Sequence, residues 1–165
     1  GAVLALSLTA CAGNGDGASS QAGTDSSQAG EAQMGKTLDV EAAAQALLDG
    51  ADFDDELAEV SEKVVAGQYQ GLDMSDVVSC KVYISGTASG DELSVFEAKD
   101  AEAAQRIKTV TETRLSSLIE QYSDYAPDKV PKLEDPVLVV EGNYVVLCVS
   151  NDNAKAQELL DAQWK

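Results

Sequence analysis

Carboxylates are the residues of this chain with the most chemistry to offer, since Asp and Glu number 29 and no histidine is present. Two carboxylates about 5 to 9 Å apart across a cleft can hydrolyse a glycosidic bond. The lack of histidine excludes Ser-His-Asp and Cys-His catalysis and histidine-containing zinc sites. The chain also has no Ser-x-x-Lys motif and no glycine-rich phosphate loop. Carboxylate chemistry and binding are what remain.

The densest group of acids lies in the stretch "ADFDDELAEVSEK". Its candidate binding residues are Asp52, Asp54, Asp55 and Glu56. An EF-hand loop beginning at Asp52 fails, because Leu57 occupies the glycine position and Lys63 the position of the bidentate Glu. The group therefore forms either a looser cation-binding site or a solvated loop whose acids favour a helix N-terminus. We expect neither a resident metal nor a cofactor.

Cys11 ends a short apolar run and begins a polar stretch. The run is too short to span a bilayer, and it closes as Leu8-Thr9-Ala10-Cys11, which looks like a bacterial lipobox. Residues 1–10 are then part of a signal peptide, and Cys11 is the lipidated N-terminus of a protein held on the extracytoplasmic face of the cell membrane. The alternative is a buried helix that ends at a core cysteine.

The polar stretch after Cys11 has the composition of a linker. Residues 12–36 consist mostly of Gly, Ala, Ser and Gln, with almost nothing to bury. Such a coil has a typical reach of roughly 25 to 30 Å. Residues 11–36 therefore read as the lipidated cysteine and a flexible tether, and residues 37–165 as one domain.

The domain is strongly acidic. The chain carries a net charge of −18, and the three acids and one lysine of residues 12–36 leave −16 on residues 37–165. A field of this sign repels nucleic acid and anionic lipid headgroups. Cationic ligands, divalent metals and basic protein surfaces are compatible partners, and a solvated acidic surface that only keeps the protein soluble is the alternative.

The first two thirds of the domain alternate between helical and strand patterns. We expect a helix over 38–50, a short strand over 57–60 and a helical turn to residue 67. A strand begins at Val77 with Val78, Cys80, Val82 and Ile84 on one face, and "ELSVFEAK" returns as its hairpin partner with Leu93 and Val95 facing the same core. Asp100 then caps a long helix that Pro127 stops. Its packing residues are Ala104, Ile107, Val110 or Thr111, Leu115, Leu118, Tyr122 and Tyr125.

The last third predicts a second hairpin and a closing helix. Gly142 and Asn143 form a two-residue loop, so that Glu141 faces Tyr144 and the pairing continues to Leu138 with Leu147. Both faces of this hairpin are apolar, so both must be covered, which predicts either two central strands of the sheet or an exposed binding patch. Asp152 or a neighbouring Asn caps the closing helix, which packs through Leu159, Leu160 and Trp164.

These elements define the fold class. The order strand, turn, strand, capped helix occurs twice, which predicts an α+β domain. Its antiparallel sheet of about four strands comes from two ββα-like units with helices packed on it. Cys80 and Cys148 lie within strands, either as free thiols or as a disulfide if those strands are neighbours.

Four stretches of the chain resemble a known family. They are the Cys11 lipobox with its polar tether, "DELSVFEAK", "YSDYAP" and "VEGNYVVLCVSND". They resemble the domain-of-unknown-function family 4358, small lipoproteins of anaerobic Gram-positive bacteria, over most of residues 37–165. The resemblance implies lipoprotein status and an outer-face location, and no activity. An anaerobic owner favours free thiols at Cys80 and Cys148.

Two classes of function fit these observations. The first is a tethered binding or protein-interaction module whose partner is an envelope protein or a cationic ligand, and the lack of catalytic residues favours it over an enzyme. The second is a carboxylate-dependent hydrolase of cell-wall glycan, which requires two acids in a deep cleft and one raised carboxyl pKa.

Overall fold

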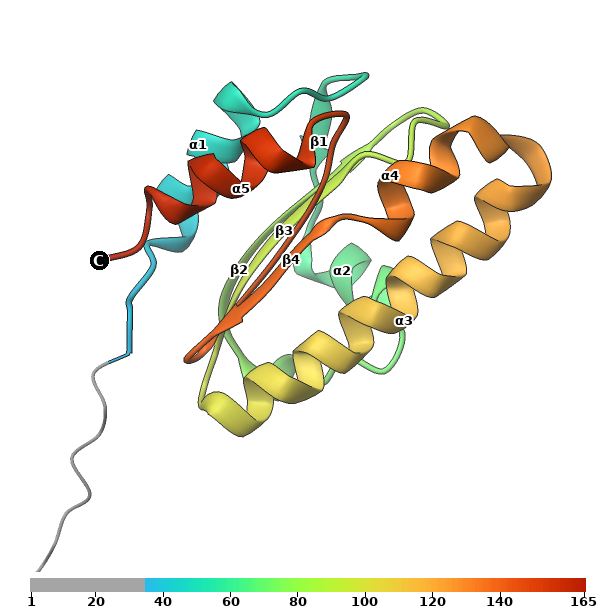
Figure 1. Cartoon of the computed structure of the whole chain (residues 1–165). Coiled ribbons are helices and arrows are strands. Elements are labelled where there is room, and N and C mark those ends of the chain that lie inside the picture. Colours follow the sequence, from blue (N-terminus) through green and yellow to red (C-terminus); the bar gives the residue numbers. More distant parts are fainter. Residues whose placement is uncertain (1–34) are drawn as a thin grey trace, which may run out of the picture. The chain divides into compact units, whose positions relative to one another are not determined.

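A computed structural model describes residues 35–165, and Cys11 with the preceding signal segment and most of the tether lies outside this range. In the described part an antiparallel sheet of five strands has the order β1-β2-β3-β5-β4 (Figure 1). The strands are β1 (Leu57–Glu59), β2 (Val77–Ser85), β3 (Glu92–Ala98), β4 (Val137–Glu141) and β5 (Tyr144–Val149). The α+β class is confirmed, and β1 adds a fifth strand to the expected four.

Helices cover both faces of this sheet. They are α1 (Val40–Gly50), α2 (Glu62–Gln68), α3 (Ala101–Tyr125), α4 (Val130–Glu134) and α5 (Asn153–Asp161), with short 3-10 helices η1 (Met74–Asp76) and η2 (Pro127–Lys129). Helices α1 and α5 pack on one face, and α2, α3 and α4 pack on the other (Figure 1). The two ββα-like units therefore place their helices, α3 and α5, on opposite sides of one sheet.

Aspartates fix the starts of three of these helices. Asp39, Asp100 and Asp152 each accept a hydrogen bond from the backbone amide three residues later, at 3.0, 2.7 and 2.9 Å. A side-chain cap satisfies an amide that has no partner within the helix, and it stabilises the helix by about 1 kcal/mol. The caps expected at Asp100 and Asp152 are confirmed.

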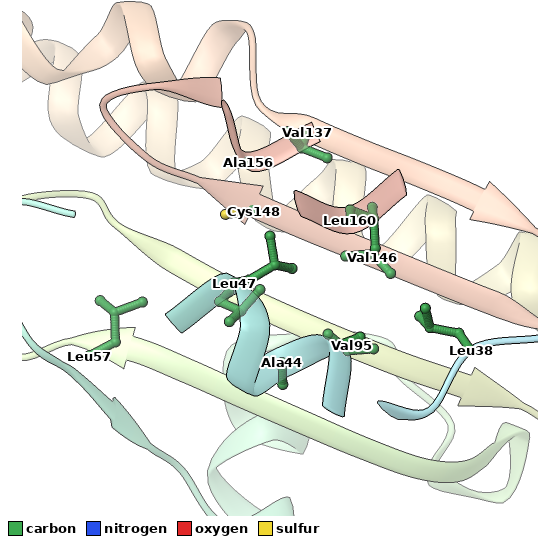
Figure 2. Close-up of a cluster of buried hydrophobic side chains, with 12 residues drawn as sticks. Leu38, Ala44, Leu47, Leu57, Val95, Val137, Val146, Cys148, Ala156 and Leu160 are labelled. Atoms are coloured by element: carbon green, nitrogen blue, oxygen red, sulfur yellow. The ribbon is translucent and has the colours of Figure 1, made fainter. Parts of the chain in front are cut away.

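The face under α1 and α5 holds one hydrophobic cluster. Side chains from both helices point toward the sheet and meet apolar side chains of β3, β4 and β5 (Figure 2). The buried members are Leu38, Ala43, Ala44, Leu47, Leu57, Leu93, Val95, Val137, Val146, Cys148, Ala156 and Leu160. Trp164 packs at the rim, where its ring meets Tyr144 edge to face.

The opposite face holds two clusters that follow α3. One lies under α2 and the first half of α3, and the other lies under the second half of α3 and α4. Their buried members are Val65, Tyr69, Val82, Phe96, Ala98, Ala103, Ala104, Ile107 and Val145, then Leu115, Leu118, Tyr122, Leu133, Leu147 and Val149. Tyr125 is 52% exposed and does not join them, because α3 ends there before Pro127 turns the chain.

The β4–β5 hairpin has the expected register. Glu141 pairs with Tyr144 and Leu138 with Leu147, and Gly142 adopts a φ of 57°, a left-handed conformation that glycine takes without a steric penalty. Side chains on both faces of the hairpin are packed against helices. Both faces are therefore covered, as expected, but the expectation of two central strands is confirmed only for β5 and is wrong for β4, which is the last strand of the sheet.

Two expectations for the first hairpin are wrong. The pairing of β2 with β3 shifts between Val77 and Ser79, so that Val77 packs against the α3 side and Val78 is 61% exposed. Leu93 and Val95 face α1, on the opposite side of the sheet from Val82. Because helices cover both faces, β3 is apolar on both of them, and its pattern could not show which residues face α1.

Candidate binding site

The acidic stretch before β1 does not converge on a single point. The side chains of Asp52 and Glu56 are exposed, whereas Asp54 and Asp55 bond to different groups. In the described residues 35–165, no group of three or more His, Cys, Asp or Glu side chains could hold a metal ion. Of the four residues predicted to form one binding group, Asp54 thus belongs to one site and Asp55 and Glu56 to a neighbouring one, whereas Asp52 belongs to neither and contributes only its backbone carbonyl, which accepts the Asn151 amide.

Asp54 belongs to the first of these sites, a network of two lysines, two aspartates and an asparagine. Its carboxylate accepts hydrogen bonds from Lys129 and Lys132, both at 2.9 Å, and from the side-chain amide of Asn151 at 2.8 Å. These donors hold the pKa of Asp54 well below its ordinary value, with Lys129 the largest cause. Asp54 is therefore an anion that the fold has already neutralised.

Lys132 is the centre of this network. Its ammonium lies 2.5 Å from a carboxylate oxygen of Asp91, whose side chain is fully buried. The other oxygen of Asp91 accepts the backbone amide of Asp54 at 2.7 Å. Lys132 also donates to Asn151 at 3.2 Å. The network joins α4, the loop before β1, the start of β3 and the end of β5, so its role is to hold these segments together.

Asp55 and Glu56 belong to the second site, which we call the acidic hollow. This hollow of about 270 Å³ lies between α1 and the chain that leads into β1. It is lined by Gln45, Leu48, Asp49, Phe53, Asp55, Glu56 and Leu57. Apolar side chains and three carboxylates therefore share one small space.

The electrostatics of the acidic hollow favour a cation. Asp55 accepts hydrogen bonds from the hydroxyls of Thr87 and Ser85, and the Thr87 bond is the main cause that lowers its pKa. Asp49 lies in the last turn of α1, which contains no basic residue. The carboxyl end of a helix carries partial negative charge. The carboxyl end of α1 and the carboxylates thus both contribute negative electrostatic potential to the hollow.

The four acids of the described part whose carboxyl pKa is shifted are poorly suited to general acid catalysis. Where a carboxyl pKa is shifted, at Asp54, Asp55, Asp73 and Asp76, it is lowered. A general acid at neutral pH needs a raised pKa, which comes from burial without a cationic partner. These four residues instead remain anions in neutral solution.

A buried polar cluster on the α3 side was not predicted from the sequence. The Tyr69 hydroxyl donates to Glu92 at 2.6 Å, and the Arg114 guanidinium donates to both oxygens of the same carboxylate. Burial, together with the Glu92 charge, raises the pKa of Tyr69 well above its usual range. Arg114 follows Thr111 by three residues on the packed stripe of α3, and this spacing was the one available signal.

The two described cysteines are inert. Both are free, and they lie on strands that are not neighbours, with Cys148 facing α1 and α5 and Cys80 packed on the α3 side. A disulfide between them is excluded by this geometry. Burial raises the pKa of Cys148 to about 12 and also raises that of Cys80. Both thiols stay protonated at neutral pH and are poor nucleophiles.

Fold and site together define a small, strongly anionic α+β domain whose open hollow is lined by carboxylates. None of the helices in residues 35–165 is long and apolar enough to cross a membrane. Residues 50–160 match the family described as Domain of unknown function (DUF4358), and the chain belongs to that family, as the sequence predicted. No curated protein and no solved structure matches the chain.

Proposed function

We propose that this protein is a lipoprotein anchored on the extracytoplasmic face of the cell membrane, and that its domain binds a basic partner. The partner is an envelope protein or another cationic ligand, and it inserts a lysine or arginine side chain into the acidic hollow. The observation that carries the binding proposal is the placement of Asp49, Asp55 and Glu56 around one hollow at the carboxyl end of α1.

The hollow has the size and lining for one cationic side chain. A volume of about 270 Å³ admits a lysine or arginine but not a folded segment. The half-buried ring of Phe53 and the apolar surface of Leu48 suit the aliphatic stem, and an aromatic face also attracts a cation. The carboxylates of Glu56 and Asp49 then pair with the charged end. Because the site is open to solvent, we expect binding to weaken at high ionic strength.

Photocrosslinking in intact cells tests the binding proposal. A photoreactive amino acid replaces Phe53 in the full-length protein, and the matched control carries it at Tyr125, which is exposed at the end of α3. We expect an adduct with one envelope protein from position 53 only. The double variant Asp49→Asn/Glu56→Gln removes two charges without touching the Asp55 bonds, and we expect it to reduce the adduct several-fold. Equal adducts in both backgrounds would contradict the proposal.

The anchoring proposal rests on the lipobox at Cys11 and on the polar composition of residues 12–36. Two or more acyl chains on one cysteine hold a protein stably to a membrane. The Cys11→Ser variant tests it by cell fractionation, with Cys80→Ser as the matched control. We expect the Cys11 variant alone to leave the membrane fraction. Membrane association that survives in this variant would overturn the anchoring proposal and leave the binding proposal untouched.

A carboxylate-dependent glycan hydrolase was the alternative. It requires a carboxyl group that stays protonated near neutral pH, whereas the four shifted carboxyl pKa values are lowered. The acidic hollow has a volume of only about 270 Å³, and an extended glycan substrate requires a longer cleft. Nothing in the described residues favours this alternative over binding.

A further inference from the structure

The outer edge of β4 presents unpaired backbone groups. In the part of the chain that the structure describes, β4 is the last strand of the sheet and pairs only with β5. The Ala98 amide donates to the Asn143 carbonyl at 2.7 Å. In an antiparallel ladder the backbone groups of successive residues point to opposite neighbouring strands. The backbone groups of Asn143, Val145 and Leu147 therefore point toward β3, and those of the residues between them point toward β4. By the register of the β4–β5 hairpin, the backbone groups of Leu138 and Val140 point away from β5.

The features that usually block strand addition lie only at the ends of this edge, where Pro136 directly precedes β4 and Glu141 ends it. Natural edge strands are protected by charged residues, prolines, bulges or a covering segment. On the other side of the sheet, β1 covers one end of β2, and the rest of β2 carries a bulge at Val77 and the ion-paired Lys81. Within β4 the residues from Val137 to Val140 are all apolar, and no bulge interrupts their pairing with β5.

The edge is also held rigid, which lowers the entropy cost of adding a strand. Val137 and Val139 pack under α5 and α1, and Leu138 and Val140 pack on the α3 side. Both sets of side chains are therefore fixed by helices. Among residues 35–165 no strand pairs with the outer edge, and Gly35 and Lys36 approach only the loop at Gly142. In Figure 1 β4 is the outermost strand of the sheet, beyond β5.

Charge selects the occupant of this edge. Glu134 and Asp135 are exposed just before β4, and Glu141 ends it, so that acids flank the apolar centre at both ends. A second copy of the chain would bring the same acids and another −16 on residues 37–165 against this edge. The complementary segment has an apolar, β-branched centre and lysine or arginine at its ends.

We propose that β4 accepts an extended segment of a basic partner protein as an additional strand of the sheet. Main-chain hydrogen bonds to Leu138 and Val140 supply affinity, and charge pairs at the two ends supply selectivity. The acidic hollow lies beside β1, at the opposite edge of the strand order, so this site does not depend on that hollow. The two proposals can be tested and can fail separately.

Amide hydrogen exchange, followed by NMR on the full-length Cys11→Ser protein, tests strand addition. The probe is the synthetic peptide Lys-Val-Thr-Val-Thr-Val-Lys. We expect it to slow exchange at Leu138 and Val140 about tenfold or more, and to leave the Val139 amide, which already bonds to β5, unchanged. The charge-reversed peptide Glu-Val-Thr-Val-Thr-Val-Glu and a peptide N-methylated at its central valine serve as controls and should have no effect.

Three variants separate backbone pairing from other causes. Val140→Pro removes the outward amide without removing a bond to β5, and we expect it to abolish the effect at Leu138, whereas Val140→Ala retains the amide and the effect. Glu141→Lys leaves every amide in place and should weaken the cationic peptide at least threefold, which keeps the test valid if Val140→Pro does not fold. Unchanged exchange at Leu138 and Val140 with the peptide would overturn the proposal. Protection that rises with protein concentration without peptide would also overturn it, because the occupant would be a second copy.

Discussion

In this acidic protein the single side chain of Lys132 neutralises two carboxylates. Its ammonium meets Asp54 and Asp91, and its side chain is only 10% exposed. A buried carboxylate that loses the cation paired with it pays the cost of desolvation without compensation. The neighbouring Lys129 pairs with the same Asp54 but is 31% exposed, so solvent can replace its contribution.

We therefore expect Lys132→Met and Lys129→Met to differ in stability although both remove one charge. Lys132→Met should lower the free energy of unfolding by about 3 to 5 kcal/mol, because Asp91 stays buried without its partner. Lys129→Met should lower it by about 1 kcal/mol or less. Urea denaturation of the two variants measures the difference. Equal losses would show that the network acts as a surface ion pair.

Single residues were predictable from sequence where their role is local. The caps Asp100 and Asp152 and the turn at Gly142 act on backbone within a few residues, so the sequence around them carried the signal. Glu92 pairs with Arg114 across 22 positions, and Lys132 with Asp91 across 41. Such pairs depend on how β3 meets α3 and α4, which no local pattern specifies.

At the scale of elements, glycine acts oppositely in a turn and in a helix. Gly142 closes the β4–β5 hairpin with a φ of 57°, where a side chain is strained. Gly67 lies within α2, and a Cβ added there would have no atom within 4 Å. Glycine at such a helical position only adds entropy to the unfolded chain.

The same substitution should therefore change stability in opposite directions at these two positions. We expect Gly142→Ala to lower the free energy of unfolding by about 1 to 2 kcal/mol, and Gly67→Ala to raise it by about 0.5 to 1 kcal/mol. Thermal unfolding of the two variants beside the wild type measures both. Destabilisation by Gly67→Ala would contradict the account of α2, and stabilisation by Gly142→Ala that of the hairpin.

Elements were predictable in proportion to the regularity of their pattern. The two-residue loop of the β4–β5 hairpin fixes one register, and that register was correct. A bulge shifted the face of Val77 and Val78, because one extra residue breaks the alternation that the prediction relied on. Helix α4 was missed because Pro127 was interpreted only as the end of α3, whereas Pro131 occupies the first turn of a new helix.

At the scale of the whole molecule, acids outnumber bases so strongly that the few cations are committed to structure. Arg106 donates to both oxygens of Asp76, and Lys99 lies 2.8 Å from the same carboxylate. These donors, Arg106 first, hold the pKa of Asp76 well below its ordinary value of 3.8. Because the pKa is lowered by folding, Asp76 stabilises the folded state while it is ionised.

Asp76 should therefore make the stability of the folded protein depend on pH in the acid range. The contribution of Asp76 is fully present above about pH 5 and is lost as the pH falls through 3.8 toward the lowered value. We expect wild type to exceed Asp76→Asn in stability at pH 7, and the gap to shrink steadily below pH 4. Chemical denaturation of both proteins between about pH 3 and 7 measures the gap, and comparing the pair cancels the effect of net charge. A gap that widens in acid would contradict the assignment.

The sequence predicted the layers of the molecule better than the order of its strands. Both faces of the last hairpin are apolar, which indicated that both must be covered, and helices cover both of them. The position of β5 between β3 and β4 was not predicted, since both hairpins are apolar and either strand of one hairpin could have paired with either strand of the other. The acidic stretch was located correctly as a loop, but its division between a structural network and an open hollow depends on Lys132 and α1.

The strand order has a consequence for the order of folding steps. The β2–β3 and β4–β5 hairpins join neighbours in sequence and can form quickly, whereas the pairing of Glu92 with Val149 joins segments that are far apart in the chain and forms later. Until then β3 has a bare backbone edge and apolar side chains on both faces. The slow and aggregation-prone step of folding is thus the arrival of β5, and a chaperone that shields the unfolded chain would act on β3.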